Sequence, residues 1–295
     1  MVLKALPRFR PMVWGNSELN RIFNLETEAP IGEIWLLSGH PLYETSLEGV
    51  GLSLNELSSR IFGKRYPRFP LLVKLVSTNQ WLSVQVHPDD EFAKTIEDEP
   101  WGKSEAWYFV TDGEFAICED TDLMKELVNE GRIDEIKDIL TFVKVKSGTI
   151  VNIPAGTVHA LGPNSTVVEV QQSSDLTYRI YDWGRPRETH LEKALKVSRN
   201  VKVSDIVFPN AKELRTDYFT IRVFSDNFVA DKNILNENLS IIVPLELNKE
   251  FSAYLSISDT YAERTGLSIH GEYSIGNLRA IFITLGPVYN AFLEQ

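Results

Sequence analysis

Polar and apolar residues alternate in residues 81–90, a segment that contains one of the five histidines of the chain. If this segment is a β-strand, alternation directs Ser83, Gln85 and His87 to one face and leucine and valine side chains to the other. A polar strand face opposite an apolar one suits the interior of a barrel. There the strand would present an imidazole nitrogen and an amide oxygen, two groups that can ligate a metal ion.

Two further segments carry groups of the same kind. Lys103 and Glu105 are two positions apart in residues 102–107, so they share a strand face. In residues 148–159 a glycine, five residues, Pro-x-Gly and two more residues lead to His159, and this turn delivers the imidazole onto a strand. Two imidazoles with two oxygen donors suit a borderline divalent metal such as zinc. The predicted metal ligands are Gln85, His87, Glu105 and His159.

The composition narrows the class of partner. The 295 residues include 30 Lys and Arg against 41 Asp and Glu, which gives a net charge of −11. A broad positive face for nucleic acid or for an anionic membrane surface is therefore not expected. Any anionic ligand must meet a local cluster of basic side chains. We expect a small-molecule ligand, no nucleic-acid partner and no membrane partner.

Cysteine use and the first residues bear on the cellular compartment. The single cysteine, Cys118, excludes an internal disulfide and a thiolate metal cage, and it fits a reducing compartment. Lys4, Arg8 and Arg10 interrupt any signal-peptide core. No run of the sequence approaches the about 20 apolar residues that span a bilayer. We therefore expect a cytoplasmic protein.

Short strand-like runs bounded by Gly, Pro, Asn or Asp dominate the sequence and predict an all-β fold. Apolar spacing in residues 122–140, with Gly131 inside, predicts two short amphipathic helices, and smaller helices are expected at 54–59 and 191–197. A boundary near Val201, without a low-complexity linker, predicts two closely packed parts. The predicted strands are 34–38, 71–76, 81–87, 106–111, 142–145, 167–172 and 178–181, then 219–224, 239–244, 251–257 and 281–285.

Several motifs together resemble a known family. The turn 148–159 is similar to the second cupin motif, and Gln85-x-His87 followed by Glu105 and Gly113 is similar to a stretched first motif. In its wider context, from near the start to about residue 190, the sequence resembles the type I mannose-6-phosphate isomerases. The segments that carry this resemblance are Trp14-Gly15, Ile31-Gly-Glu-Ile-Trp35, Leu72-x-Lys74, Ser83-Val-Gln-Val-His-Pro88, Gly102-Lys-Ser-Glu105 and Ser174-Asp-Leu-Thr-Tyr-Arg179.

The resemblance implies a fold of two cupin-like β-barrels of the jelly-roll type. Residues 1–200 would form a catalytic metal-binding barrel with a short helical insertion at about 122–140. Residues 201–295 would form a second cupin-like barrel without a metal site.

The same resemblance implies a metal-dependent aldose-ketose isomerase that interconverts mannose 6-phosphate and fructose 6-phosphate through an enediol intermediate. One divalent metal per chain is expected, zinc or another divalent ion, held by the four predicted ligands. The partner is then a small phosphosugar, and the chain is expected to be a monomer or a weak homo-oligomer. Lys74 aligns with another lysine of the family and, together with Ser83, is expected to bind this substrate.

Such a reaction moves a proton between C2 and C1 while charge accumulates on the sugar oxygens, so the site needs a base and an electrophile. Lys103, two positions before the predicted ligand Glu105, is one candidate for proton transfer. The resemblance adds Glu169 and Asp175, which match acidic positions of the family, and the sequence does not choose among the three. Arg179 aligns with the family's functional arginine. Its planar, permanently charged fork can clamp phosphate or stabilise developing oxyanion charge.

Other functions are compatible with nearly the same ligands, because the cupin barrel supports many reactions. One alternative is another cupin phosphosugar isomerase. A metal-dependent oxygenase is disfavoured because the fourth protein ligand, Gln85, leaves fewer open positions than a facial triad does. A non-catalytic sugar-binding cupin would need a pocket without proton-transfer groups, whereas this sequence offers Lys103, Glu169 and Arg179 together.

Overall fold

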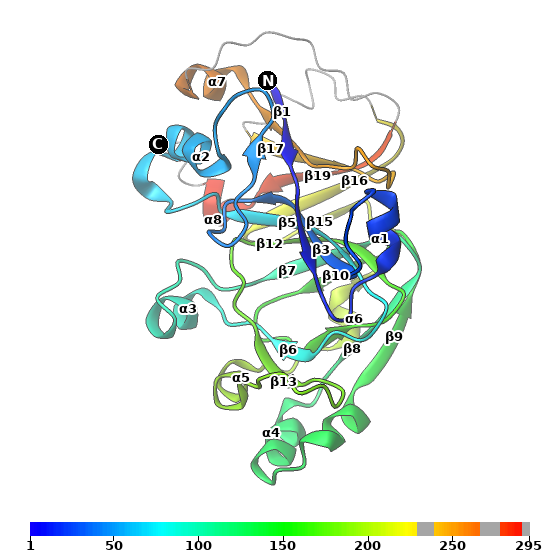
Figure 1. Cartoon of the computed structure of the whole chain (residues 1–295). Coiled ribbons are helices and arrows are strands. Elements are labelled where there is room, and N and C mark those ends of the chain that lie inside the picture. The colour runs from blue at the N-terminus through cyan, green and yellow to red at the C-terminus, as the bar shows by residue number, and fades with distance from the viewer. Residues whose placement is uncertain (229–238, 266–277, 291–295) are drawn as a thin grey trace.

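The computed structural model describes residues 1–228, 239–265 and 278–290. Over these ranges the strands form three antiparallel sheets, which follow one another from the top to the bottom of Figure 1 with short helices around them. The prediction of a mainly β fold is therefore confirmed.

The first sheet, at the top of Figure 1, consists mostly of strands from the C-terminal third of the chain. The N-terminal strand β1 (Val2–Leu6) is also part of this sheet, because it pairs with β18 (Tyr254–Ile257) on one side and with β4 (Ser46–Leu47) on the other. The order is β15 (Glu213–Arg215), β16 (Phe219–Phe228), β19 (Leu278–Leu285), β17 (Leu239–Pro244), β18, β1 and β4.

The middle and third sheets contain the segments predicted to carry the metal ligands. The order of the middle sheet is β14 (Val207–Phe208), β10 (Ile150–Ile153), β7 (Glu105–Phe109), β12 (Thr166–Gln172), β5 (Leu71–Ser77), β3 (Ile31–Ser38) and β2 (Arg8–Pro11). The order of the third sheet is β13 (Tyr178–Tyr181), β6 (Val84–Val86), β11 (His159–Leu161), β8 (Gly113–Ile117) and β9 (Thr141–Val145).

The middle sheet is covered on both faces, and strand alternation decides which side chains face which neighbour. On β5, Val73 and Leu75 belong to the apolar core shared with the first sheet, together with Ile283. Val76 belongs to a second core, which contains Phe115 of the third sheet. Lys74 alternates with Val73 and Leu75, so it points with Val76 toward the third sheet. The polar site is built on that side.

The predicted helices are present, with one difference in type. Residues 122–140 contain α4 (Thr121–Asn129) and then a 3₁₀ helix, η2 (Ile133–Ile139), separated by Gly131 at φ 74°. A capping box between Ser53 and Glu56 starts α2 (Leu54–Phe62). The other helices are α1 (Ser17–Ile22), η1 (Gly63–Arg65), α3 (Asp90–Ile96), α5 (Leu191–Val197), α6 (Val203–Ile206), α7 (Asp259–Thr265) and α8 (Pro287–Asn290).

Over the described ranges, none of the helices combines the length and the apolar character needed to cross a bilayer.

Candidate metal centre and active-site cavity

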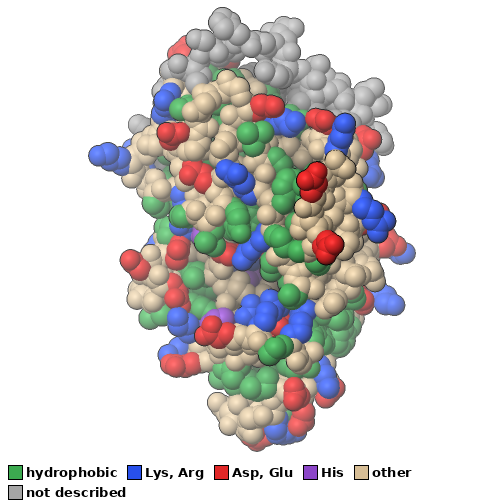
Figure 2. Space-filling model, viewed as in Figure 1, with side chains coloured by type: hydrophobic (Ala, Val, Ile, Leu, Met, Phe, Trp, Pro, Cys, Tyr) green, Lys and Arg blue, Asp and Glu red, His purple; other side chains and the backbone are tan. Residues whose placement is uncertain are grey.

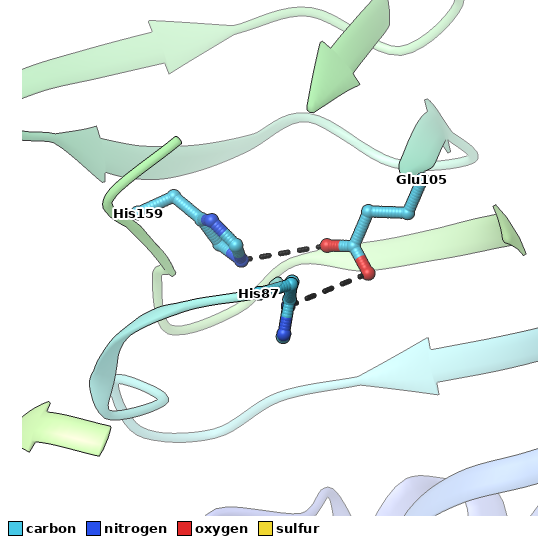
Figure 3. Close-up of side chains that lie close together, drawn as sticks. All are labelled: His87, Glu105 and His159. Atoms are coloured by element: carbon cyan, nitrogen blue, oxygen red, sulfur yellow. Dashed lines mark ion pairs between the residues drawn. The ribbon is translucent and has the colours of Figure 1, made fainter. Parts of the chain in front are cut away.

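Three of the four predicted metal ligands converge between the middle and third sheets (Figure 3). Glu105 begins β7, His159 begins β11, and His87 follows β6. Glu105 Oε1 lies 3.4 Å from His159 Nε2, and Glu105 Oε2 lies 3.7 Å from His87 Nε2. All three side chains are fully buried, and their ligating atoms lie within 4.8 Å of one another.

Backbone carbonyls fix the orientation of both imidazoles. His87 Nδ1 donates to Leu176 O at 2.8 Å, and His159 Nδ1 donates to Thr157 O at 2.9 Å. A carbonyl oxygen only accepts, so in each neutral ring the proton is on Nδ1 and Nε2 keeps its lone pair. The Nε2 atoms of both rings face the Glu105 carboxylate, which is the arrangement expected of metal-ligating histidines.

The electrostatics keep His87 and Glu105 in their metal-binding protonation states. Burial, together with the nearby Lys103 ammonium, holds the pKa of His87 well below its usual value. Burial alone would raise the pKa of Glu105, but Lys103 and His87 outweigh it and hold that pKa well below its usual value. Neutral imidazoles and an ionised carboxylate are the forms that coordinate a cation.

The residues present fit a divalent metal. His159 Nε2 is buried and finds no hydrogen-bond partner among the described residues, which is unusual for a buried polar atom unless something else satisfies it. The fourth predicted ligand, Gln85, pairs directly with His159 in the strand register. Its Oε1 accepts from Ser83 Oγ at 3.4 Å. Two imidazoles, a carboxylate and a nearby amide oxygen form a donor set suited to zinc.

A cavity of about 240 Å³ opens beside these ligands. On the face shown in Figure 2 the molecule is hollowed near its middle, and Lys and Arg side chains gather around the hollow. Although the chain is acidic, the described cavity lining includes five cationic side chains against three carboxylates. The cations are Arg10, Lys74, Lys103, Arg179 and Arg187, and the carboxylates are Glu33, Glu169 and Asp175.

The sequence is similar to those of known proteins. Residues 3–117 match the family model described as "Phosphomannose isomerase type I, catalytic domain". A Bacillus subtilis protein named "Probable mannose-6-phosphate isomerase" is 34% identical over 241 residues, which cover 75% of this chain and 76% of the relative. The chain belongs to the type I mannose-6-phosphate isomerase family.

A further relative supports this membership, and solved structures share the fold. The mannose-6-phosphate isomerase of Streptococcus mutans is 35% identical over 211 residues, 67% of this chain and 66% of that one. The crystal structure of the Bacillus subtilis mannose 6-phosphate isomerase shares the fold, with a TM-score of 0.75 and 24% identity over 96% of this chain and 98% of that chain. A zinc-bound mannose 6-phosphate isomerase matches with a TM-score of 0.68 and 14% identity, over 97% and 99% of the two chains.

Lys103 connects the candidate metal cluster to the cavity. Its Nζ lies 2.6 Å from Glu105 Oε2, 3.2 Å from His87 Nε2 and 3.7 Å from Glu169 Oε1. The side chain is almost fully buried. An ammonium in this position balances the charges of Glu105 and Glu169. Two of the predicted proton-transfer candidates, Lys103 and Glu169, are therefore in contact with each other.

Lys74 is held by carboxylates rather than left free. Its Nζ lies 3.2 Å from Glu169 Oε1, 3.9 Å from Glu33 Oε2 and 4.0 Å from Asp175 Oδ1. Burial alone would lower the pKa of Lys74, but these carboxylates outweigh it and raise the pKa above its usual value. For Glu169, burial and the nearby Glu105 charge raise the pKa above the usual value despite the two lysines.

Arg179 reaches the same cavity from β13. Its Nη1 donates to Glu188 O at 2.6 Å, while its Nε is buried without a hydrogen-bond partner in the described part of the chain. Burial, together with the nearby Arg187 charge, lowers the pKa of Arg179. Ser83 also lines the cavity, so the structure places both of these predicted residues at the same cavity.

Sequence reasoning missed three charged residues of the cavity: Arg10, Glu33 and Arg187. Glu33 Oε2 accepts from Trp35 Nε1 at 2.8 Å and from Arg10 Nη1 at 3.2 Å. Glu33 lies within the family-like segment 31–35, where strand alternation with Trp35 was an available signal. For Arg10 the local sequence gave no such signal, because its partners are far away in the chain.

Proposed function

We propose that this protein is a metal-dependent aldose-ketose isomerase that interconverts mannose 6-phosphate and fructose 6-phosphate through an enediol. The observation that carries the proposal is the cavity beside the buried His87, Glu105 and His159 cluster, because its lining has more cationic than anionic side chains in a chain of net charge −11. A local excess of cations suits a dianionic phosphosugar. The family membership supports the same reaction.

Zinc is the proposed metal, and one of the family's structures is described as zinc-bound. The groups that would hold it are the imidazoles of His87 and His159, the Glu105 carboxylate and the Gln85 amide oxygen. When bound, a divalent ion polarises or positions sugar oxygens near it. The same site accepts other divalent ions in principle, because its ligands are mixed nitrogen and oxygen donors.

We propose Glu169 as the base that moves the proton between C2 and C1, with Lys103 as its partner. Glu169 lines the cavity, and its pKa is raised, which brings a carboxylate closer to the range useful for general base catalysis. Lys103 Nζ lies 3.7 Å from Glu169 Oε1 and 2.6 Å from the proposed ligand Glu105, so we propose that it donates protons to the sugar oxygens. Asp175, the third candidate, faces Arg10 and Lys74 with its two carboxylate oxygens.

The phosphosugar would be held by the cationic and hydroxyl groups of the cavity. Arg179 has a buried Nε without a partner among the described residues, so its fork is available to phosphate or to an oxygen that gains charge. Lys74 and Ser83 line the same cavity and are proposed substrate contacts. The charge of Lys74 is shared with three carboxylates, so its contribution to phosphate binding is smaller than its position alone indicates.

The arrangement of the whole chain is proposed on the same basis. The three sheets support two cupin-like jelly-roll barrels, with the metal-binding one in residues 1–200 and a second one without a metal site in residues 201–295. Strand β1 joins the sheet of the second part, so the division is not strictly sequential. The single buried Cys118 supports a reducing, cytoplasmic setting. We propose a monomer or a weak homo-oligomer.

A comparison of two sugars tests the proposal. The value of kcat/KM should be far higher for mannose 6-phosphate than for free mannose, because phosphate contacts supply binding energy that orients C1 and C2. Equal use of both sugars would favour a neutral-sugar isomerase. Binding of mannose 6-phosphate without formation of fructose 6-phosphate would favour a non-catalytic sugar-binding cupin.

A further inference from the structure

The segment between β12 and β13, residues 173–177, carries the carbonyl that orients a predicted metal ligand. Leu176 O accepts from His87 Nδ1 at 2.8 Å. The position of this carbonyl therefore decides where the His87 ring points, and it keeps the proton away from Nε2. The residue directly before Leu176 is Asp175, one of the three candidates for proton transfer.

Two cations from the middle sheet hold the Asp175 side chain. Its Oδ2 lies 3.4 Å from Arg10 Nη1, and its Oδ1 lies 4.0 Å from Lys74 Nζ. Arg10 is fixed in turn, because the same Nη1 lies 3.2 Å from Glu33 Oε2 and the guanidinium lies 5.8 Å from the centre of the Trp35 ring. Asp175 is thus anchored to strands β2 and β5.

Two further side chains anchor the first two residues of the segment. Arg68 donates to Ser173 O from Nε at 3.0 Å and from Nη2 at 2.6 Å. Gln171 Nε2 donates to Ser174 O at 2.5 Å. Leu176 N–H donates to Ser174 Oγ at 3.3 Å, a contact within the segment. The two ion pairs of Asp175, the residue next to Leu176, tie this part of the segment to strands β2 and β5.

We propose that Asp175 is a positioning residue of the metal centre: held by Arg10 and Lys74, it fixes the Leu176 carbonyl that orients His87. This inference rests on the metal centre of the proposed function. It assigns Asp175 a role that acts through His87 rather than a direct proton transfer. Groups that orient a metal-ligating histidine change metal affinity by about 10–100-fold when they are removed.

Zinc affinity tests the proposal without reference to turnover. We would compare the zinc dissociation constants of wild type, Asp175→Asn and Arg10→Met by competition with a chromophoric chelator. Asparagine keeps the size of Asp175 but loses the charge, and Arg10→Met removes the same restraint from its other end. The expected result is a rise in the zinc dissociation constant of about 10–100-fold in each variant. The visible spectrum of the cobalt-substituted protein should change as the imidazole rotates.

Asp182→Asn is the matched control. Asp182 also pairs with two cations near the cavity, Arg185 at 2.7 Å and Arg187 at 2.6 Å. It is not adjacent to a carbonyl that orients a metal ligand, so its zinc affinity should stay close to wild type.

The outcomes separate this inference from the proposed function. Wild-type zinc affinity and an unchanged cobalt spectrum in both Asp175→Asn and Arg10→Met would overturn the positioning role. An equal loss of affinity in Asp182→Asn would also overturn it, because the effect would then be a general response to lost charge pairs. If wild type itself bound no zinc, the proposed metal centre would fail, and the inference with it. A fall in turnover at unchanged zinc affinity would return Asp175 to the proton-transfer candidates.

Discussion

Glu169 and Lys74 lie directly opposite each other in the antiparallel register of β12 and β5, and Glu169 Oε1 is 3.2 Å from Lys74 Nζ. Directly opposed side chains on one sheet face are close enough to interact. Here both point away from the core that the middle sheet shares with the first sheet and toward the cavity. The register therefore places a buried carboxylate, with its countercharge, at the wall of the cavity.

Because Glu169 lies at the cavity, we expect Glu169→Gln to lower kcat by about 10²–10⁴-fold, the range typical of a lost general base. The zinc content should stay at the wild-type level, because Glu169 is not among the ligands. Steady-state kinetics and elemental analysis on the same preparation would check both values. A variant with normal kcat would remove Glu169 from the mechanism and leave Lys103 as the remaining candidate, with Lys103→Met as its test.

Removal of any one of the His87, Glu105 and His159 side chains should cause a strong loss of bound metal. Each of these alanine variants takes one donor from a buried cluster whose ligating atoms lie within 4.8 Å of one another. His40→Ala is the control, because His40 lies outside this cluster and its Nδ1 accepts a hydrogen bond from the Leu42 N–H. Elemental analysis after dialysis gives the readout. Full metal occupancy in the three variants would contradict the assignment of the site.

Arg179→Lys should impair catalysis and leave the fold and the metal content intact. Lysine keeps the positive charge but loses the planar fork that can donate two parallel hydrogen bonds. We expect kcat/KM for mannose 6-phosphate to fall by about 10²–10³-fold, as when one donor to a developing oxyanion is lost. Arg199→Lys, at an exposed ion pair with Asp89, is the matched control. Near-normal turnover of Arg179→Lys would reduce Arg179 to a structural role.

The buried charge of Glu33 makes part of the stability dependent on pH. Burial alone would raise the pKa of Glu33, but Lys74 and Arg10 outweigh it and lower the pKa below its usual value of 4.5. The ionised form is therefore favoured in the folded protein, and its stabilisation is complete above about pH 4.5 and is lost as the pH falls through the folded pKa.

Glu33→Gln should consequently destabilise the protein by about 3–5 kcal/mol near pH 7, the usual cost of removing one partner of a buried ion pair. The difference from wild type should narrow as the pH falls below 4.5, where the wild-type carboxyl also becomes neutral. Urea unfolding at a series of pH values measures this. A difference that stays constant from pH 7 into acid would show that the charge of Glu33 contributes nothing.

The sequence indicated the candidate metal ligands because each lies in a short segment with its own signal, and the structure brings three of them, His87, Glu105 and His159, together. Strand alternation places Ser83 and Gln85 on the cavity side, as β6 shows, and the glycine-rich turn delivers His159 to the start of β11. Alternation fixes which face a side chain occupies. It carries no information about which distant strand will pair with that face.

Long-range pairing accounts for what the sequence could not predict. Arg10 lies 165 positions before Asp175, its partner in an ion pair, and Val2 pairs with Ser256 at the opposite end of the chain. No local pattern encodes such contacts. The ion pairs of Arg10 and the pairing of β1 with β18 therefore became visible only in the three-dimensional structure. The 3₁₀ form of η2 was likewise missed, because the apolar spacing of residues 133–139 fits either kind of helix.

We propose that this chain isomerises mannose 6-phosphate at the centre formed by His87, Glu105 and His159. The most direct measurement is a coupled assay of fructose 6-phosphate formation from mannose 6-phosphate, before chelation, after chelation and after zinc is restored. Wild-type activity should disappear after chelation and return when zinc is added. The His159→Ala variant should stay inactive under all three conditions. Undiminished turnover by the metal-free protein, or no fructose 6-phosphate from the zinc-loaded protein, would contradict it.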